Sequence, residues 1–113
     1  MFHISCEQEI NIEELMGLLK QTYWAPDRPK ELVEKSLRNS VNFVAFDEAG
    51  KLIGFARVVT DFVCIYYICD VIVDEAHRGV GIGKALINAI VSDERFAHMG
   101  ALLKTKDAHG LYR

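Results

Sequence analysis

Residues 71–86 read VIVDEAHRGVGIGKAL, an apolar strand that passes through a glycine-rich turn into an amphipathic helix. Gly79, Gly81 and Gly83 let the backbone take unusual φ values and approach a ligand closely. At such a helix start, several N–H groups lack acceptors and point the same way, at the positive end of the helix dipole. The segment therefore predicts a binding site for a phosphate or pyrophosphate group.

Two common nucleotide-binding motifs do not fit this turn. The P-loop, GxxxxGK followed by Ser or Thr, would need a glycine in place of Arg78 and a magnesium-binding hydroxyl in place of Ala85. The dinucleotide fingerprint GxGxxG would need a third glycine in place of Lys84. It also requires an acidic residue at the end of the next strand, which here ends in Lys104. The phosphate site is therefore of another kind.

The composition indicates one globular domain over residues 1–113. Apolar residues make up 50% of the chain and charged residues 26%, which is enough to bury a core. No apolar run reaches the roughly 20 residues that a membrane span needs, and the N-terminus lacks a signal-peptide pattern, so we expect a cytoplasmic protein without a membrane partner. A net charge of −3 without a Lys/Arg cluster argues against a nucleic-acid partner. Three cysteines without a CxxC pair, Cys6, Cys64 and Cys69, indicate buried reduced thiols and no metal site.

Hydrophobic periodicity predicts the element order β-α-α-β-β-β-α-β-α. Strands are expected at 2–6, 41–46, 52–60, 63–73 and 101–104, the second and third as an antiparallel hairpin. Helices are expected at 12–19 after an Asn11 cap, from Pro29 with Leu32, Val33, Ser36 and Leu37 on one side, after the glycine turn, and from Asp107. The fifth strand lies beyond the third helix. The order indicates an α+β fold, a mixed sheet with helices on both faces.

The turn and its surroundings resemble the GNAT superfamily of N-acetyltransferases. Arg78 to Gly83 matches RxxGxG, the pyrophosphate loop of that family, between a strand and a helix as the family requires. Segment 50–56 resembles the family's third strand, 102–105 its fifth strand, and 107–112 (DAHGLY) the start of its last helix. The resemblance covers nearly the whole chain in the correct order. It implies the three-layer GNAT acyl-CoA N-acyltransferase fold.

The resemblance also implies acetyl-CoA as the cofactor, with no metal. Backbone amides of the loop would bind the pyrophosphate, and Arg78 would contribute through its position or its side-chain charge. The loop residues expected there are Arg78, Gly79, Val80, Gly81, Ile82, Gly83 and Lys84. In the family, the fourth and fifth strands splay apart and the pantetheine arm lies between them like an added strand. Backbone groups of Val71, Ile72 and Val73 would pair with its amides, and one N–H there would polarise the thioester carbonyl.

Catalytic residues are implied on both sides of this site. Tyr112 occupies the position of the family tyrosine that protonates the departing thiolate; the alternative is an amphipathic helix residue with a polar tip. Asp70 directly precedes the CoA-binding strand segment, where a carboxylate is costly to bury without a partner. It is interpreted either as a base or water-orienting group, or as a structural hydrogen-bond acceptor. Tyr67 stands where some members carry a catalytic glutamate, and His77 is interpreted as a solvated or capping residue.

Segment 23–29 falls where the family places its acceptor-binding part. Tyr23, Trp24 and Arg28 are the expected substrate-binding residues, with Trp24 alternatively filling the edge of the core. The family fold usually continues after its tyrosine with a strand pair, whereas this sequence stops at Arg113. We therefore expect either a C-terminally incomplete domain or a homodimer that pairs through the exposed fifth strand.

Two functions stay open at this point. The first is an N-acetyltransferase that transfers the acetyl group of acetyl-CoA to an amine of a small molecule or peptide, by direct attack in a ternary complex. The second is a catalytically inactive CoA-binding sensor or interaction module, because a fold does not by itself determine a function.

Overall fold

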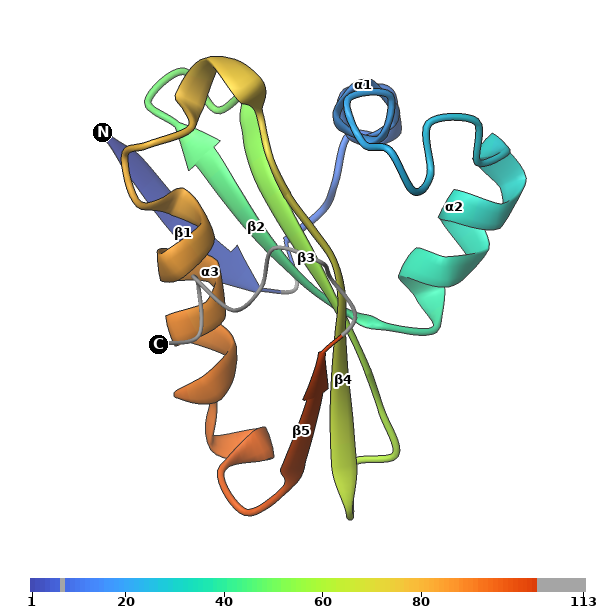
Figure 1. Ribbon diagram of the computed structural model, residues 1–113, viewed down its shortest axis with the longest axis vertical. Coiled ribbons are helices and arrows are strands. Elements are labelled where there is room, and N and C mark those ends of the chain that lie inside the picture. The colour runs from blue at the N-terminus through green and yellow to red at the C-terminus, as the bar shows by residue number, and fades with distance from the viewer. Residues whose placement is uncertain (7, 104–113) are drawn as a thin grey trace.

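The computed structural model describes residues 1–6 and 8–103, which form one mixed β-sheet with helices on both faces (Figure 1). The strands are β1 (Phe2–Cys6), β2 (Val41–Asp47), β3 (Leu52–Thr60), β4 (Ile65–Val73) and β5 (Gly100–Leu103). They follow chain order across the sheet; neighbours from β1 to β4 are antiparallel, and β4 and β5 are parallel. The predicted order from the first strand to the fifth is confirmed, and the helix expected from Asp107 lies outside the described residues.

The helices make the outer two layers. Helices α1 (Ile12–Leu19) and α2 (Lys30–Arg38) lie on one face of the sheet, and α3 (Ile82–Val91) lies on the other (Figure 1). Short 3-10 turns, η1 (Glu75–His77) and η2 (Glu94–Phe96), flank α3. This confirms the three-layer α+β fold. In the described part of the chain, no helix is long and apolar enough to cross a bilayer.

Both N-terminal helices begin close to their predicted positions. The Asn11 side chain caps α1 by accepting a hydrogen bond from the backbone N–H of Glu14 at 3.0 Å, as such caps do. Pro29 is the N-cap of α2, one residue before the first turn where it was expected. Leu32 was predicted on the buried side of this helix, but 56% of it is exposed, while Val33 is buried. Val33 is the buried residue of α2, so this helix meets the core along a narrow stripe, and the adjacent Leu32 lies outside it.

Side chains that alternate along the central strands build a core on each face of the sheet. Phe43 and Ala45 of β2 pack on the α3 side, whereas Val44 and Phe46 pack on the α1/α2 side. This is the period of two that a pleated strand imposes.

The alternation shifts by one residue in the middle of β4. Tyr66 and Ile68 pack on the α3 side, and so do Val71 and Val73 beyond the shift. The backbone of Asp70 lies between these pairs with a φ of 54°, in the left-handed region. A bulge in the pairing with β3 lies at the same level. Because a slip of one residue exchanges the two faces of a strand, the Asp70 side chain reaches the α1/α2 side.

Strand β4 starts two residues later than predicted. The Asp61 carboxylate accepts hydrogen bonds from the backbone N–H groups of Val63, Cys64 and Ile65, at 2.9 to 3.3 Å, and so closes a turn before the strand. Cys64 is exposed in this turn and Cys6 is half-buried, so the expectation of three buried thiols is confirmed for Cys69 and wrong for Cys64.

Gly54 of β3 lies under the start of α3. A Cβ atom at this position would lie 2.8 Å from Cγ2 of Ile82 and 3.1 Å from Cβ of Ala45. We expect Gly54→Ala to lower the free energy of unfolding by about 1–3 kcal/mol, because the core would be overpacked. Urea denaturation measures this change.

The matched control is Gly17→Ala. Gly17 is exposed in α1, and a Cβ there would meet nothing within 4 Å. This variant should be more stable by roughly 0.5–1 kcal/mol, because alanine favours the helix. If Gly54→Ala were as stable as the wild type, α3 would be able to move away from β3 without cost.

Candidate functional site

Two glycines give the loop between β4 and α3 its shape. Gly79 and Gly81 have φ values of +88° and +89°, which L side chains rarely adopt. Gly81 is the N-cap of α3, and no side chain caps this helix. The N–H groups of the first helical turn therefore have no intrahelical acceptor and no capping acceptor. This is the arrangement expected of an anion-binding helix start.

Strand β4 extends beyond the described residues of its neighbour β5, Gly100–Leu103. The parallel pairing joins β5 to Ile65–Ile68. Within residues 1–6 and 8–103, no strand pairs with the same edge of segment 71–73. Backbone groups on this edge are positioned to pair with an extended ligand.

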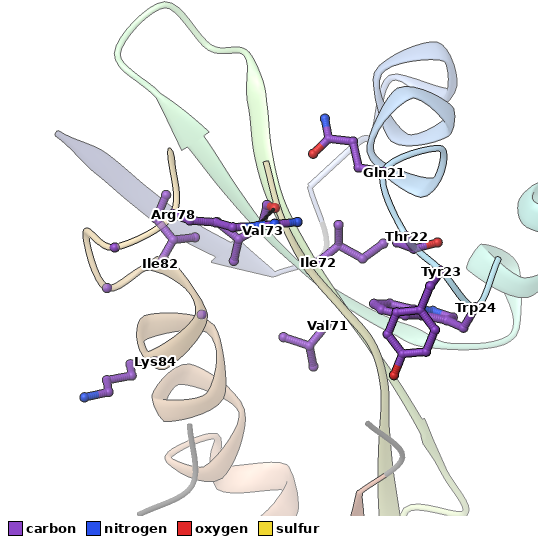
Figure 2. A pocket seen from close by; sticks show the side chains of 13 residues that line it. Gln21, Thr22, Tyr23, Trp24, Val71, Ile72, Val73, Arg78, Ile82 and Lys84 are labelled. Atoms are coloured by element: carbon purple, nitrogen blue, oxygen red, sulfur yellow. Dashed lines mark hydrogen bonds between the residues drawn. The ribbon is translucent and has the colours of Figure 1, made fainter. Parts of the chain in front are cut away.

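A cleft of about 700 Å³ joins this edge to the glycine loop and to the end of α1 (Figure 2). It is lined by Gln21, Thr22, Tyr23, Trp24, Val71, Ile72, Val73, Arg78, Gly79, Gly81, Ile82, Gly83 and Lys84. The expected cofactor residues thus lie together, except Val80, which is exposed and does not line the cleft. Of the expected substrate residues, Tyr23 and Trp24 line the cleft and Arg28 does not.

Figure 2 shows how the ends of the cleft differ. Arg78 lies near the glycine loop, Tyr23 and Trp24 lie at the other end, and the β4 segment lies between them. The Lys84 side chain points away from β4, which leaves its backbone N–H as the group positioned to contact a ligand in the loop.

An aromatic pair forms the wall at the α1 end of the cleft. The rings of Tyr23 and Trp24 meet edge to face, with centroids 5.1 Å apart and an interplanar angle of 84°. Tyr23 is 61% exposed and Trp24 is 41% exposed. This exposure fits a cleft wall better than the alternative in which Trp24 fills the edge of the core.

Asp70 is buried and accepts hydrogen bonds from three side chains. Trp24 Nε1 donates to it at 3.0 Å, Arg57 Nε at 2.8 Å, and Arg28 through Nη1 and Nη2 at 2.8 and 3.2 Å. Burial opposes ionisation of this carboxyl group, but the hydrogen bonds and charges of Arg28 and Arg57 outweigh it and lower the pKa of Asp70. The carboxylate therefore stays ionised, and it is a weak proton acceptor.

Gln21 connects the end of α1 to the loop that follows β4. Its side-chain amide donates to Asp74 Oδ1 at 2.8 Å and accepts from the backbone N–H of Glu75 at 2.9 Å. His77 Nδ1 lies 2.7 Å from Asp74 Oδ2. The hydrogen bonds from Gln21 and His77 lower the pKa of Asp74, although its partial burial acts in the opposite direction.

Three residues of this site were not found by sequence reasoning. Gln21 and Thr22 line the cleft, and Arg57 binds Asp70. Gln21 and Thr22 directly precede the predicted aromatic pair Tyr23 and Trp24. This proximity was the one signal in the sequence that pointed to them. Nothing local marks Arg57, because its partner lies on the neighbouring strand. Among the other expected residues, Tyr67 does not line the cleft, and Tyr112 lies outside the described residues.

Residues 9–113 match the sequence model of the acetyltransferase (GNAT) family. The chain belongs to the GNAT family.

Similar proteins agree with this assignment. This GNAT domain is 30% identical over 104 residues to the uncharacterized N-acetyltransferase ycf52 of Pyropia yezoensis, a match that covers 88% of this chain and 59% of that protein. The chain thus spans about three-fifths of this relative's length.

Two solved structures share the fold. A protein of the GNAT family from Xanthomonas campestris has a TM-score of 0.86 and 35% identity, over 97% of this chain and 80% of the other. The GNAT protein YhbS of Escherichia coli, in complex with CoA, has a TM-score of 0.65 and 21% identity, over 80% of this chain and 54% of the other. At that identity, YhbS supports the fold alone.

Proposed function

We propose that this GNAT domain is an N-acetyltransferase that transfers the acetyl group of acetyl-CoA to the amine of a small molecule or peptide. The observation that carries the proposal is the continuous cleft, which joins an uncapped helix start, a strand edge left unpaired by the described residues and an aromatic wall. Family membership supports this activity, and YhbS, which shares the fold, is itself in complex with CoA.

The cofactor half of the cleft suits the two polar parts of CoA. N–H groups of the loop and the first turn of α3 would donate to the pyrophosphate oxygens. The edge of segment 71–73, which no described strand pairs with, would bind the pantetheine amides as an added strand. The Arg78 guanidinium also lies at this end, where its Nε donates to the Val73 carbonyl at 3.4 Å. Its charge faces the part of the ligand that carries negative charge.

The transfer step forms one bond and breaks another. A C–N bond forms as the neutral amine nitrogen attacks the thioester carbon, and the C–S bond breaks. The nitrogen must then lose a proton, and the departing thiolate must gain one. A backbone N–H of segment 71–73 would stabilise the charge that develops on the carbonyl oxygen. We propose that Tyr112 protonates the departing thiolate. The contacts of Asp70 favour the structural role left open for it, so we assign the amine proton to solvent water.

Turnover of acetyl-CoA tests the activity. Thiol release is measured with phenethylamine, spermidine, an aminoglycoside and a lysine-containing peptide, and the product is identified by mass. Release above background with one of these amines, together with an acetylated product, supports the enzyme. No release with any of them, while CoA still binds, would favour the CoA-binding sensor instead.

Tyr112→Phe tests the proposed general acid. Because a positioned acid contributes about 10²-fold or more, the acetylation rate should fall by about that factor while CoA affinity stays unchanged. An unchanged rate would contradict the role of this tyrosine.

The homodimer is proposed to form through β5, an edge strand of the sheet in the described part of the chain. Sedimentation analysis at tens of micromolar should show a dimer, and a monomer there would count against it. The cytoplasmic location and the lack of a nucleic-acid partner stay predictions.

A further inference from the structure

We infer that Asp70 is a positioning residue whose carboxylate holds Trp24 and Arg28, and thereby fixes the linker between α1 and α2 as the acceptor wall of the cleft. That this wall binds the acceptor amine rests on the proposed function. The positioning itself rests on contacts that are independent of catalysis.

The linker reaches the sheet through these two side chains. Trp24 Nε1 and both terminal nitrogens of Arg28 donate to Asp70, which lies 46 and 42 residues further along the chain. Within the linker, Thr22 Oγ1 donates to the Leu19 carbonyl and accepts from the Ala25 N–H. These local bonds shape the linker, whereas the bonds to Asp70 attach it to β4.

The charges explain why one carboxylate can hold the linker. Asp70 is the common partner of two guanidinium groups, and its side chain is 4% exposed, against 25% for Arg28 and 18% for Arg57. Without the negative charge, the two cations would repel each other. Arg57 also donates to Ser40 Oγ at 3.2 Å and lies on β3, so it would keep its place. Arg28, on the linker, would move away, and the linker would carry the indole of Trp24 out of hydrogen-bond reach of residue 70.

Because of the bulge in β4, the Asp70 carboxylate acts on only one side of the cleft. The left-handed backbone at Asp70 turns its side chain toward α1 and α2, while Val71 and Val73 pack toward α3. The cofactor is proposed to bind backbone groups of segment 71–73 and the glycine loop, whereas the Asp70 side chain bonds to Trp24, Arg28 and Arg57. Loss of the carboxylate should therefore change the acceptor wall and leave CoA binding intact.

Trp24 is the single tryptophan of the chain, so its fluorescence reports on the linker. In Asp70→Asn, emission should shift to the red. Quenching by iodide should rise by about twofold, as the exposure of the indole increases from 41% toward that of a free side chain. The KM for the amine found in the turnover assay should rise about tenfold, because the wall no longer orients the acceptor. The Kd for CoA should stay within about twofold.

Arg28→Gln is the second variant, because it leaves the Arg57–Asp70 pair intact and so preserves the fold. It should shift the emission in the same direction but by less, because the Trp24–Asp70 hydrogen bond remains. It decides the question alone if Asp70→Asn does not fold. The matched control is Arg38→Gln, since Arg38 is an exposed arginine of α2 that does not line this cleft. This control should leave fluorescence, quenching and CoA affinity unchanged.

Two results would overturn the inference. One is unchanged fluorescence and quenching in Arg28→Gln and in folded Asp70→Asn. The other is loss of the rising limb of kcat/KM with pH in Asp70→Asn while Trp24 fluorescence stays unchanged, which would assign Asp70 as the base. If no amine is acetylated, the proposed function fails, but fluorescence and CoA titration still decide the positioning role.

Discussion

Gly81→Glu is expected to lower the affinity for CoA at least a hundredfold, which corresponds to about 2.8 kcal/mol. Two causes act together. A side chain at a φ of +89° strains the loop at the N-cap of α3. The new carboxylate also brings a negative charge to the place where the pyrophosphate is proposed to bind, so like charges repel. Isothermal titration calorimetry with CoA measures the affinity.

Gly50→Glu separates the loop effect from general damage. Gly50 has a φ of +83°, and a Cβ there would meet nothing within 4 Å. It lies in the turn between β2 and β3, so the substitution adds the same charge and a similar strain away from the cleft. Its CoA affinity should stay within about twofold of the wild type. Equal CoA binding by both variants would refute the assignment of the glycine loop.

Asp70→Asn is expected to lower the free energy of unfolding by about 3–5 kcal/mol near neutral pH, because two largely buried guanidiniums would lose their counter-charge. The folded pKa of Asp70 lies below its ordinary value of 3.8. Its contribution is thus fully present above pH 3.8 and is lost as the pH falls through the folded pKa. The difference between wild type and variant should be large near pH 7 and shrink in acid below pH 3.8. Chemical denaturation over this pH range measures it.

Glu13→Gln is the control for an ordinary ion pair. Glu13 meets Lys30 at 2.9 Å, but the two side chains are 73% and 49% exposed. Solvent screens such a pair, so its loss should give no measurable change in stability. If Asp70→Asn lowered the free energy of unfolding by the same amount at every pH down to strong acid, the hydrogen bonds of Asp70 and not its charge would account for the loss.

The predictions that proved accurate rest on local signals. Asn11 as a cap, the β2–β3 hairpin and the helix after Gly81 follow from periodicity and turn chemistry within a few residues. The errors concern strand boundaries and side-chain burial that depend on contacts with neighbouring elements. The start of β4 depends on a turn closed by Asp61, and the burial of Leu32 depends on which side of α2 meets the sheet.

The sequence by itself determined the order of the elements and the glycine loop, because RxxGxG and the apolar period act through the backbone near each residue. It also marked Asp70 as a residue in need of a partner, but it left both of its roles open. Only the tertiary structure decided which groups surround that carboxylate. A shift of one residue in β4 turns it toward the linker, where Arg28 and Trp24 meet Arg57 of β3. Such a shift depends on how two strands pair, and neither strand's own sequence specifies that pairing.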